Sequence, residues 1–139
     1  MTNTKEQGLW KYHNMSITGQ PDKDVIGFVY QIFEKDTNKS YIGIKKFWKT
    51  IKMSPLKGMK NKRYKLIESD WRIYNTSSPL MQKKLKKNPK NYDKIIIDFC
   101  TSVTEMKCNE AYYQLQYYIS NRWNLLYNQI INLRVKIKQ

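Results

Sequence analysis

Two short segments rich in β-branched and aromatic residues, joined by a polar stretch, constrain the fold of this chain more than any other feature. The first covers residues 25–33 and the second covers residues 41–44. Both compositions favour β-strands, and the polar residues 34–40 between them include Asp36 and Asn38, which suit a turn. A short turn between two strands produces an antiparallel hairpin. The sequence therefore predicts a β-hairpin in the first third of the chain.

The rest of the chain supplies a third strand and the helices that cover the sheet. Residues 92–100 contain three consecutive isoleucines, which is typical of a strand buried on both faces. Ser77 or Ser78 can cap a helix that has Pro79 at its first position. Helices are expected over residues 68–74, 79–87 and 105–119. The order predicts an α/β fold in one domain, a small three-stranded mixed or antiparallel sheet flanked by helices (β-β-α-β-α).

Composition divides the chain into a central domain with a polar arm and a basic tail. Residues 1–24 are expected to form an irregular arm, residues 25–132 the domain, and residues 133–139 the tail. Within the domain, residues 45–67 are strongly basic and are interrupted by Pro55 and Gly58. Long segments without secondary structure are usually functional or disordered. We therefore expect residues 45–67 to be a long, mobile basic loop.

The charge of the chain restricts its partners. Lys and Arg number 26 against 11 Asp and Glu, which gives a formal net charge of +15. Such an excess steers polyanions to the surface, and nucleic acid binding is strengthened by the release of counterions. No stretch approaches the ~18 apolar residues of a membrane span, and the first residues lack the apolar core of a signal peptide. We expect a cytoplasmic protein that binds nucleic acid and not a membrane.

Metal chemistry is restricted by the scarcity of soft ligands. The chain has one histidine, His13, and two cysteines that form no Cys-x-x-Cys motif. A zinc site is therefore not expected, because such sites are built from clusters of Cys and His. A metal bound by oxygen ligands remains compatible with the composition.

Two tyrosine-bearing motifs lie on the predicted hairpin. The tripeptide Phe-Val-Tyr occupies positions 28–30 and the tripeptide Tyr-Ile-Gly occupies positions 41–43, with the two tyrosines 11 residues apart. This pair resembles the signature of the GIY-YIG nucleases. The second motif is a full match, whereas the first contains one residue more than the family pattern, counted from Gly27. The resemblance implies a small α/β nuclease domain.

The order of later residues strengthens this resemblance. In the family, an arginine-bearing helix, a third strand, a helix with one glutamate and a late asparagine follow the two motifs. Here Arg72, the strand at 92–100, Glu110 and Asn128 occur in that order. Residues 68–78 also resemble a segment of the small Seg-type GIY-YIG endonucleases of T-even-like phages. The resemblance covers roughly residues 25–132.

The resemblance implies a role for each matching residue. Tyr30 matches the general base or water-positioning tyrosine, and Tyr41 matches the tyrosine that orients water or the scissile phosphate. Gly43 matches a glycine whose missing side chain lets the backbone pack closely. Glu110 matches the ligand of a single divalent metal, Mg²⁺ or Mn²⁺, and Asn128 matches an asparagine that supports the site.

The position of the family's arginine is less clearly marked. Arg72 is the first choice, with Arg63 and Lys46 as alternatives, and Tyr74 matches a position where some members use histidine or tyrosine. A tyrosine with a reference pKa near 10 is a poor base at neutral pH. For a tyrosine to act as a base here, nearby cations and a metal ion are expected to lower its pKa. DNA contacts are expected from Lys45, Lys46, Lys49, Lys52, Lys60, Lys62 and Arg63.

These residues together predict metal-dependent hydrolysis of a DNA phosphodiester by a homing-type or DNA-processing nuclease of a phage. A hard divalent ion needs few protein carboxylates when phosphate oxygens and waters complete its coordination shell. Two other functions stay open: a catalytically inactive nucleic-acid-binding module of the same fold, and a basic protein-interaction or structural factor. A homodimer on DNA and a phage or host protein partner also stay open.

Overall fold

The tyrosine-bearing hairpin forms as the sequence predicts, and it lies at one edge of the sheet. In the computed structural model, which describes residues 9–133, β3 (Gly27–Glu34) pairs antiparallel with β4 (Ser40–Lys46), and Tyr30 lies opposite Gly43. Strand β7 (Tyr92–Cys100) pairs antiparallel with the other edge of β3, with a register shift beside Tyr30. The three predicted strands are confirmed as β7-β3-β4.

The sheet has five strands instead of the three that we expected. Strands β1 (Lys11–Tyr12) and β2 (Met15–Ser16) extend it in the order β2-β1-β7-β3-β4, and β1 runs parallel to β7, so the sheet is mixed. His13 and Asn14, both with positive φ, form the two-residue turn between β1 and β2. Two-residue strands leave no periodicity to detect, which is why residues 9–24 were expected to be irregular.

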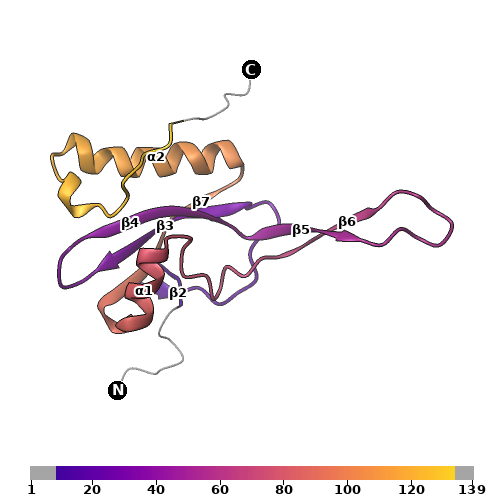
Figure 1. Ribbon diagram of the computed structural model, residues 1–139, viewed down its shortest axis with the longest axis horizontal. Helices are drawn as coiled ribbons and strands as arrows, with labels where there is room; N and C mark the ends of the chain where they lie inside the picture. The colour runs from indigo at the N-terminus through magenta and orange to yellow at the C-terminus, as the bar shows by residue number, and fades with distance from the viewer. Residues whose placement is uncertain (1–8, 134–139) are drawn as a thin grey trace.

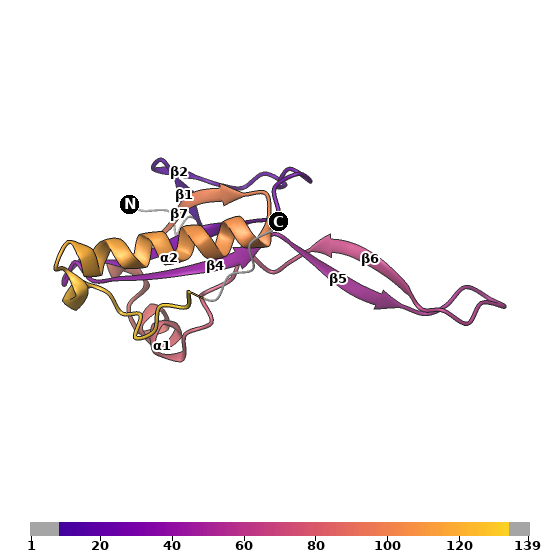
Figure 2. The same cartoon turned by 90° about the horizontal axis from the view of Figure 1, so that it is seen from above.

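Two helices cover the two faces of the sheet (Figure 1). Helix α2 (Val103–Ile119) lies on one face, over a cluster of Val29, Ile42 and Met106. Helix α1 (Pro79–Lys87) lies on the opposite face, where its buried residues join the larger core cluster. Seen from above, α2 runs across the strands of the sheet (Figure 2). The larger cluster contains Trp10, Phe28, Tyr30, Ile32, Phe47, Trp71, Met81, Leu85 and Ile96.

Side chains cap both helices at their first turns. Ser78 accepts a hydrogen bond from the Met81 amide at 3.4 Å, and Pro79 takes the first helical position, as predicted. Ser102 accepts from the Glu105 amide at 3.1 Å, and the Glu105 carboxylate accepts from the Thr101 amide at 3.0 Å. These contacts satisfy backbone donors that the helices leave unpaired.

Residues 45–67 are not the mobile irregular loop that we expected. Strand β5 (Trp48–Met53) and strand β6 (Arg63–Glu68) form a two-stranded antiparallel hairpin that projects from the body (Figures 1 and 2). Pro55 and Gly58 fall in the connection between the strands, so they mark its turn and not a wholly irregular segment. We call residues 48–68 the basic ribbon.

The remaining connections are short. The helix expected over residues 68–74 is also wrong, because Glu68 ends β6 and residues 71–73 form a turn. Short 3₁₀ helices occur at η2 (Pro89–Asn91) and η3 (Trp123–Leu125). Within residues 9–133, no helix has the length and apolar character needed to cross a membrane.

Candidate active site around strand β4

Tyr30 lies at the centre of the face of the sheet that α1 covers. Its side chain is 1% exposed, and its ring lies 6.2 Å from Tyr41 and 6.1 Å from Tyr74, measured between centroids. Residues at alternate positions of a strand share a face, so Tyr41 and Lys45 of β4 point to the same side as Gly43, which lies opposite Tyr30. The two tyrosines of the motifs therefore do converge.

Gly43 makes room for the phenol of Tyr30. A Cβ built at Gly43 would overlap the Tyr30 hydroxyl and ring. Any larger residue at position 43 would therefore displace the Tyr30 side chain from the face of β4. The glycine at the end of the second motif therefore leaves space for the Tyr30 ring. The resemblance implied that the backbone packs closely at this glycine, and in this structure the group that approaches it is the Tyr30 side chain.

A chain of hydroxyl groups fixes the position of the Tyr30 hydroxyl. Burial raises the pKa of Tyr30 well above its usual value, and the neighbouring Tyr74 and Tyr41 raise it further. A hydrogen bond with Tyr74 also raises this pKa, and one with Thr76 opposes the shift. The protein's own groups keep Tyr30 neutral, contrary to our expectation of a lowered pKa.

Thr76 is a functional candidate that the sequence did not reveal. Its side chain is buried and its φ is +68°, which is strained for a β-branched residue. The strain is held by the start of α1: the Thr76 hydroxyl accepts from the Ser78 amide at 2.8 Å, and its carbonyl accepts from Gln82 at 2.7 Å. The only signal in the sequence is a run of hydroxyl residues before Pro79.

Of the two motif tyrosines, Tyr41 is the more accessible to solvent. Burial raises its pKa, a hydrogen bond from Ser77 opposes the shift, and the charges of Tyr74 and Glu110 raise it further. The charge of Glu110 reaches Tyr41 from helix α2, which lies on the other face of the sheet. The structure therefore brings Tyr30 and Tyr41 together on one face of β4, with Glu110 on the helix that covers the other face.

The edge of β4 is closed by amide side chains. Asn128 accepts from the Ile42 amide at 2.9 Å and donates to the Ile42 carbonyl at 2.8 Å, so it pairs with β4 as a neighbouring strand would. Gln114, one helical turn after Glu110, donates to the same carbonyl at 3.2 Å. Asn128 is thus placed at the edge of β4 beside the second motif.

The oxygen ligands at this edge suit a hard divalent ion. The Gln114 Oε1 atom is buried and has no hydrogen-bond partner in the structure, and burial raises the pKa of Glu110 while the amide of Gln114 opposes the shift. A buried amide oxygen without a donor is costly, and it is the kind of ligand that Mg²⁺ or Mn²⁺ accepts. No cluster of three or more His, Cys, Asp or Glu side chains exists within residues 9–133. An ion here would depend on Glu110 as its carboxylate ligand.

Arg72 is placed in structural contacts. Its Nε atom forms an ion pair with Glu68 at 3.0 Å, and its two terminal nitrogens donate to the carbonyls of Thr18 and Gly19. The guanidinium also lies 4.6 Å from the centre of the Trp71 ring. None of these contacts involves Tyr30 or Tyr41, and Arg72 lies in a turn and not in a helix.

Lys45 is the cation that the structure places beside the tyrosines. Its Nζ lies 4.1 Å from the centre of the Tyr74 ring and 2.6 Å from the Asp70 carboxylate. The Lys45 side chain is largely covered, whereas Lys46 points to the other side of β4 and Arg63 lies at the far end of β6. A cavity of about 460 Å³ exists elsewhere, under residues 16–22, and none of the predicted catalytic side chains lines it.

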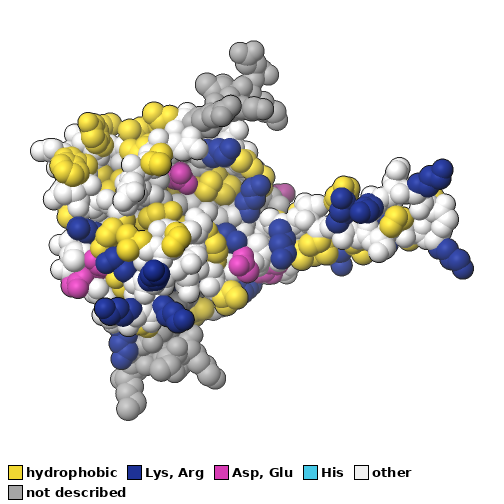
Figure 3. Space-filling view, in the orientation of Figure 1, with side chains coloured by type: hydrophobic (Ala, Val, Ile, Leu, Met, Phe, Trp, Pro, Cys, Tyr) yellow, Lys and Arg dark blue, Asp and Glu magenta, His cyan; other side chains and the backbone are white. Residues whose placement is uncertain are grey.

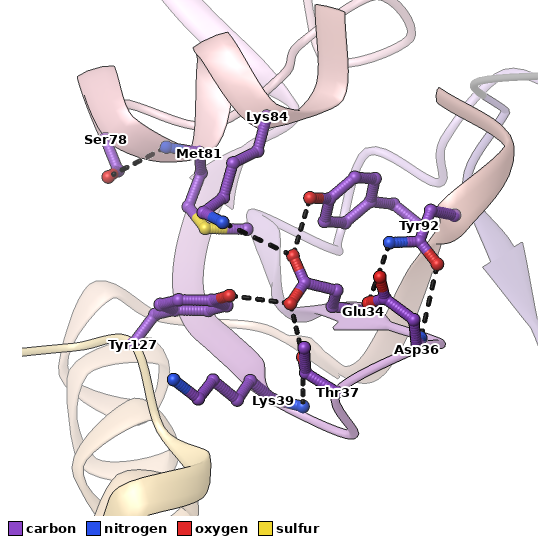
Figure 4. A network of polar contacts seen from close by, with 10 residues as sticks. Glu34, Asp36, Thr37, Lys39, Ser78, Met81, Lys84, Tyr92 and Tyr127 are labelled. Carbon is purple, nitrogen blue, oxygen red and sulfur yellow. Dashed lines mark hydrogen bonds and ion pairs between the residues drawn. The ribbon is translucent and has the colours of Figure 1, made fainter. Parts of the chain in front are cut away.

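A buried carboxylate holds the chain segment that carries Asn128 (Figure 4). Glu34 accepts hydrogen bonds from Thr37, from Tyr92 at 2.6 Å and from Tyr127 at 2.7 Å, and Lys84 approaches it to 3.6 Å. Burial raises the pKa of Glu34, but these donors outweigh it and lower the pKa to about 2. The network joins β3, β7, α1 and the segment after η3.

A comparison with protein families agrees with this geometry. The model of the GIY-YIG domain of segE-type endonucleases matches residues 10–131, which include both tyrosine motifs, Glu110 and Asn128. A search of curated proteins and a search of solved structures each returned no significant match. The match extends over most of the chain, and the sheet with its two covering helices is consistent with the same fold. The chain belongs to the segE-type GIY-YIG endonuclease family.

Proposed function

We propose that this protein is a metal-dependent DNA endonuclease that hydrolyses a phosphodiester bond beside strand β4. The observation that carries the proposal is the packing of Tyr30 against Tyr41 beside Gly43 of the second motif, in a chain that a GIY-YIG endonuclease model matches over residues 10–131. A homing-type or DNA-processing role in a phage is the biological setting that we propose, because the sequence resembles the Seg-type endonucleases of T-even-like phages and matches the segE GIY-YIG domain.

Glu110 would hold a single Mg²⁺ or Mn²⁺ ion, with the Gln114 Oε1 atom as a second oxygen ligand. Such an ion supplies Lewis-acid stabilisation of the phosphate and of the departing oxygen. Glu110 and Gln114 are four residues apart on α2, so their side chains lie on one face of the helix. Asn128 keeps the edge of β4 fixed relative to them.

The tyrosines act as neutral hydroxyls in this proposal. Tyr30 is buried and has a raised pKa, so it is a positioning residue that fixes the hydroxyl of Tyr74. Tyr41 is more accessible than Tyr30, and its hydroxyl orients the attacking water or a phosphate oxygen. Removing the Tyr30 hydroxyl should therefore disturb the position of the Tyr74 hydroxyl, and it should not remove a proton acceptor from the reaction.

Lys45 is expected to contribute more to cleavage than Arg72. Lys45→Met removes the cation beside Tyr74, and we expect the nicking rate to fall about 100-fold, the usual loss when one charge-stabilising group is removed. Arg72→Met removes an ion pair and two carbonyl contacts, so it should mainly lower Tm. Initial rates of supercoiled plasmid nicking, measured well below each Tm, separate the two effects. A larger rate loss for Arg72→Met in folded protein would contradict this assignment.

The proposal is tested by metal-dependent nicking of supercoiled plasmid. The full chain is incubated with plasmid in Mg²⁺, in Mn²⁺ and in EDTA, and the nicked and linear forms are quantified. We expect nicking in both metals and none in EDTA. Cleavage that persists in EDTA would exclude the metal mechanism.

One observation favours a second candidate, a DNA-binding module without cleavage. The residue matched to the family's arginine is occupied by structural contacts. This candidate predicts no nicking of several DNA substrates in any metal, together with salt-sensitive DNA binding. Stable association with a protein and no affinity for DNA would instead indicate an interaction factor.

A further inference from the structure

Beyond its base at Trp48 and Glu68, the basic ribbon projects from the domain without a partner strand. Strands β5 and β6 pair only with each other, and Figures 1 and 2 show them extending away from both helices. A two-stranded hairpin by itself is at best marginally stable in water. The ribbon therefore contributes little to the core, and its length needs another explanation.

The charge of the ribbon is of one sign except at its base. Between Phe47 and Glu68 there are seven Lys or Arg residues and no Asp or Glu. All seven are exposed, and within residues 9–133 none of them forms an ion pair. On the face drawn in Figure 3, Lys and Arg side chains occur along the ribbon as far as its tip. The seven residues are Lys49, Lys52, Lys57, Lys60, Lys62, Arg63 and Lys65.

The two faces of the ribbon differ. Residues opposite each other in an antiparallel pair share a face, so Lys52 with Tyr64, and Thr50 with Leu66, lie on one side. On this side Tyr64 and Leu66 are 65% and 59% exposed. The other side carries the pairs Lys49–Ile67, Ile51–Lys65 and Met53–Arg63, whose apolar members are half-buried.

We propose that the basic ribbon enters the major groove of duplex DNA, with the face of Thr50, Lys52, Tyr64 and Leu66 toward the base edges. A two-stranded ribbon fits the major groove, about 12 Å wide, and not the minor groove of about 6 Å. Lysine can donate to guanine, a threonine hydroxyl can pair with several bases, and apolar groups contact the thymine methyl. This inference rests on the proposed nuclease function and identifies the surface that recognises its substrate.

The dimensions and position of the ribbon fit this role. Each strand has six residues, which at about 3.3 Å per residue spans about 20 Å, or about six base pairs. The ribbon starts three residues after Lys45 and ends two residues before Asp70, and these two side chains form an ion pair beside Tyr74. DNA held by the ribbon would therefore pass the candidate active site.

The electrostatic part of the proposal is tested by removing three ribbon charges. Binding of the full chain to a fluorescein-labelled 30-base-pair duplex is measured by anisotropy in EDTA from 50 to 300 mM KCl. The triple variant Lys49→Gln, Lys52→Gln, Lys65→Gln should reduce the salt slope by about 2.7 and the affinity at 0.15 M on the order of 100-fold.

The matched control removes three exposed lysines from α1. The variant Lys83→Gln, Lys86→Gln, Lys87→Gln loses the same net charge from the body of the protein. We expect a clearly smaller loss of slope and affinity than in the ribbon variant. Equal losses would mean that net charge alone determines binding, and this would overturn the proposal. Because the ribbon pairs with no other strand, the ribbon variant should keep the wild-type Tm. The control removes Lys86 and Lys87 from the last turn of α1, where cations favour the helix dipole, so its Tm should fall slightly and binding is measured well below it.

The groove is identified by competition with small ligands. A duplex containing an A·T tract is titrated with methyl green, which occupies the major groove, and with netropsin, which occupies the minor groove. We expect methyl green to displace the protein and netropsin to leave it bound. The variant Tyr64→Ser, Leu66→Ser should keep the salt slope and bind about tenfold more weakly. Displacement by netropsin alone, or unchanged affinity of this variant, would overturn the assignment.

These experiments separate the ribbon proposal from the nuclease proposal. Wild-type protein that binds through the ribbon but never cleaves would contradict the nuclease and leave the ribbon assignment standing. Metal-dependent cleavage that is equally efficient in the ribbon variants would contradict the ribbon assignment and leave the nuclease standing.

Discussion

Replacing Glu110 with glutamine is expected to reduce metal-dependent DNA cleavage by about 10³-fold or more while the protein stays folded. Glu110 is the carboxylate that we propose as the metal ligand, and within residues 9–133 there is no cluster of three acidic, His or Cys side chains that could replace it. Loss of a catalytic metal removes several kcal/mol of transition-state stabilisation, and each 1.36 kcal/mol is a tenfold change in rate. The readout is the initial rate of plasmid nicking in Mg²⁺.

Glu105 on the same helix provides a matched control. Its carboxylate accepts from the Thr101 amide and hydroxyl at the start of α2, so its role there is structural. Glu105→Gln makes the same chemical change and keeps an oxygen acceptor, and we expect a nicking rate within about twofold of wild type. Raising the Mg²⁺ or Mn²⁺ concentration should partly restore Glu110→Gln if Gln114 and phosphate still hold the ion. Wild-type cleavage by Glu110→Gln would show that the metal site lies elsewhere.

The parts of the fold that depend on local sequence were predicted correctly. The strand at residues 92–100 has the bounds of β7, and Ser78 with Pro79 begins α1 where the capping pattern indicates. In these segments the β-branched run, the cap and the proline restrict the backbone directly. The family resemblance added the approach of the two motif tyrosines, whose rings lie 6.2 Å apart.

The ribbon and the first two strands were missed because their pairing is not local. Strand β1 pairs with β7, whose partner residue Ile95 lies 84 positions away from Lys11. In the ribbon, lysines occupy both faces, so the alternation of apolar and polar residues that identifies a strand is weak. Pro55 and Gly58 were correctly identified as residues that interrupt regular structure. That they lie in the turn of a hairpin follows only from the pairing of the strands on either side of residues 54–62.

Within the candidate site, Lys45 could have been predicted from the sequence, whereas Thr76 could not. Lys45 follows Tyr41 and Gly43 at alternate positions of a strand, so its place on the same face was implied by the period of two. Thr76 is different, because a β-branched residue with φ of +68° is rare and no local pattern predicts it. Arg72 was favoured through the resemblance, and the structure shows it in contacts with Glu68 and residues 18–19.

Glu34→Gln is expected to destabilise the protein by about 3 kcal/mol and to lower Tm by about 10 °C. Glu34 is 3% exposed and accepts hydrogen bonds from Thr37, Tyr92 and Tyr127. Glutamine cannot serve all of these donors, and it leaves the Lys84 ammonium without its carboxylate. Breaking a buried charged network by removing one partner is strongly destabilising. Urea unfolding at pH 7, followed by tryptophan fluorescence, measures the change.

The same residue predicts a dependence of stability on pH. The pKa of Glu34 in the folded protein is about 2, against an ordinary value of 4.5. A lowered pKa in the folded state means that the contribution is fully present above pH 4.5 and is lost as the pH falls toward 2, and the shift corresponds to about 3 kcal/mol. The difference in stability between wild type and Glu34→Gln should therefore shrink over this range.

Asp36 in the same turn is the control for the Glu34 experiment. Its carboxylate is exposed and accepts from Asn91 at 2.9 Å. Exposed polar contacts of this kind contribute little, so Asp36→Asn should cost less than about 1 kcal/mol. A loss as large as that of Glu34→Gln would mean that negative charge in the turn matters, and not the buried network.

The Glu34 network also connects stability with the candidate active site. Tyr127 donates its hydroxyl to Glu34 and its amide to the Ser40 carbonyl at 2.7 Å, and the next residue, Asn128, pairs with Ile42 in β4. Glu34→Gln should release Tyr127 and thereby loosen Asn128, even at temperatures where the protein remains folded. Hydrogen exchange should then accelerate at the amides of Tyr127 and Ile42, with amides between β3 and β7 less affected, and nicking should slow about tenfold. Uniform acceleration throughout the sheet would show that Glu34 supports only the global fold.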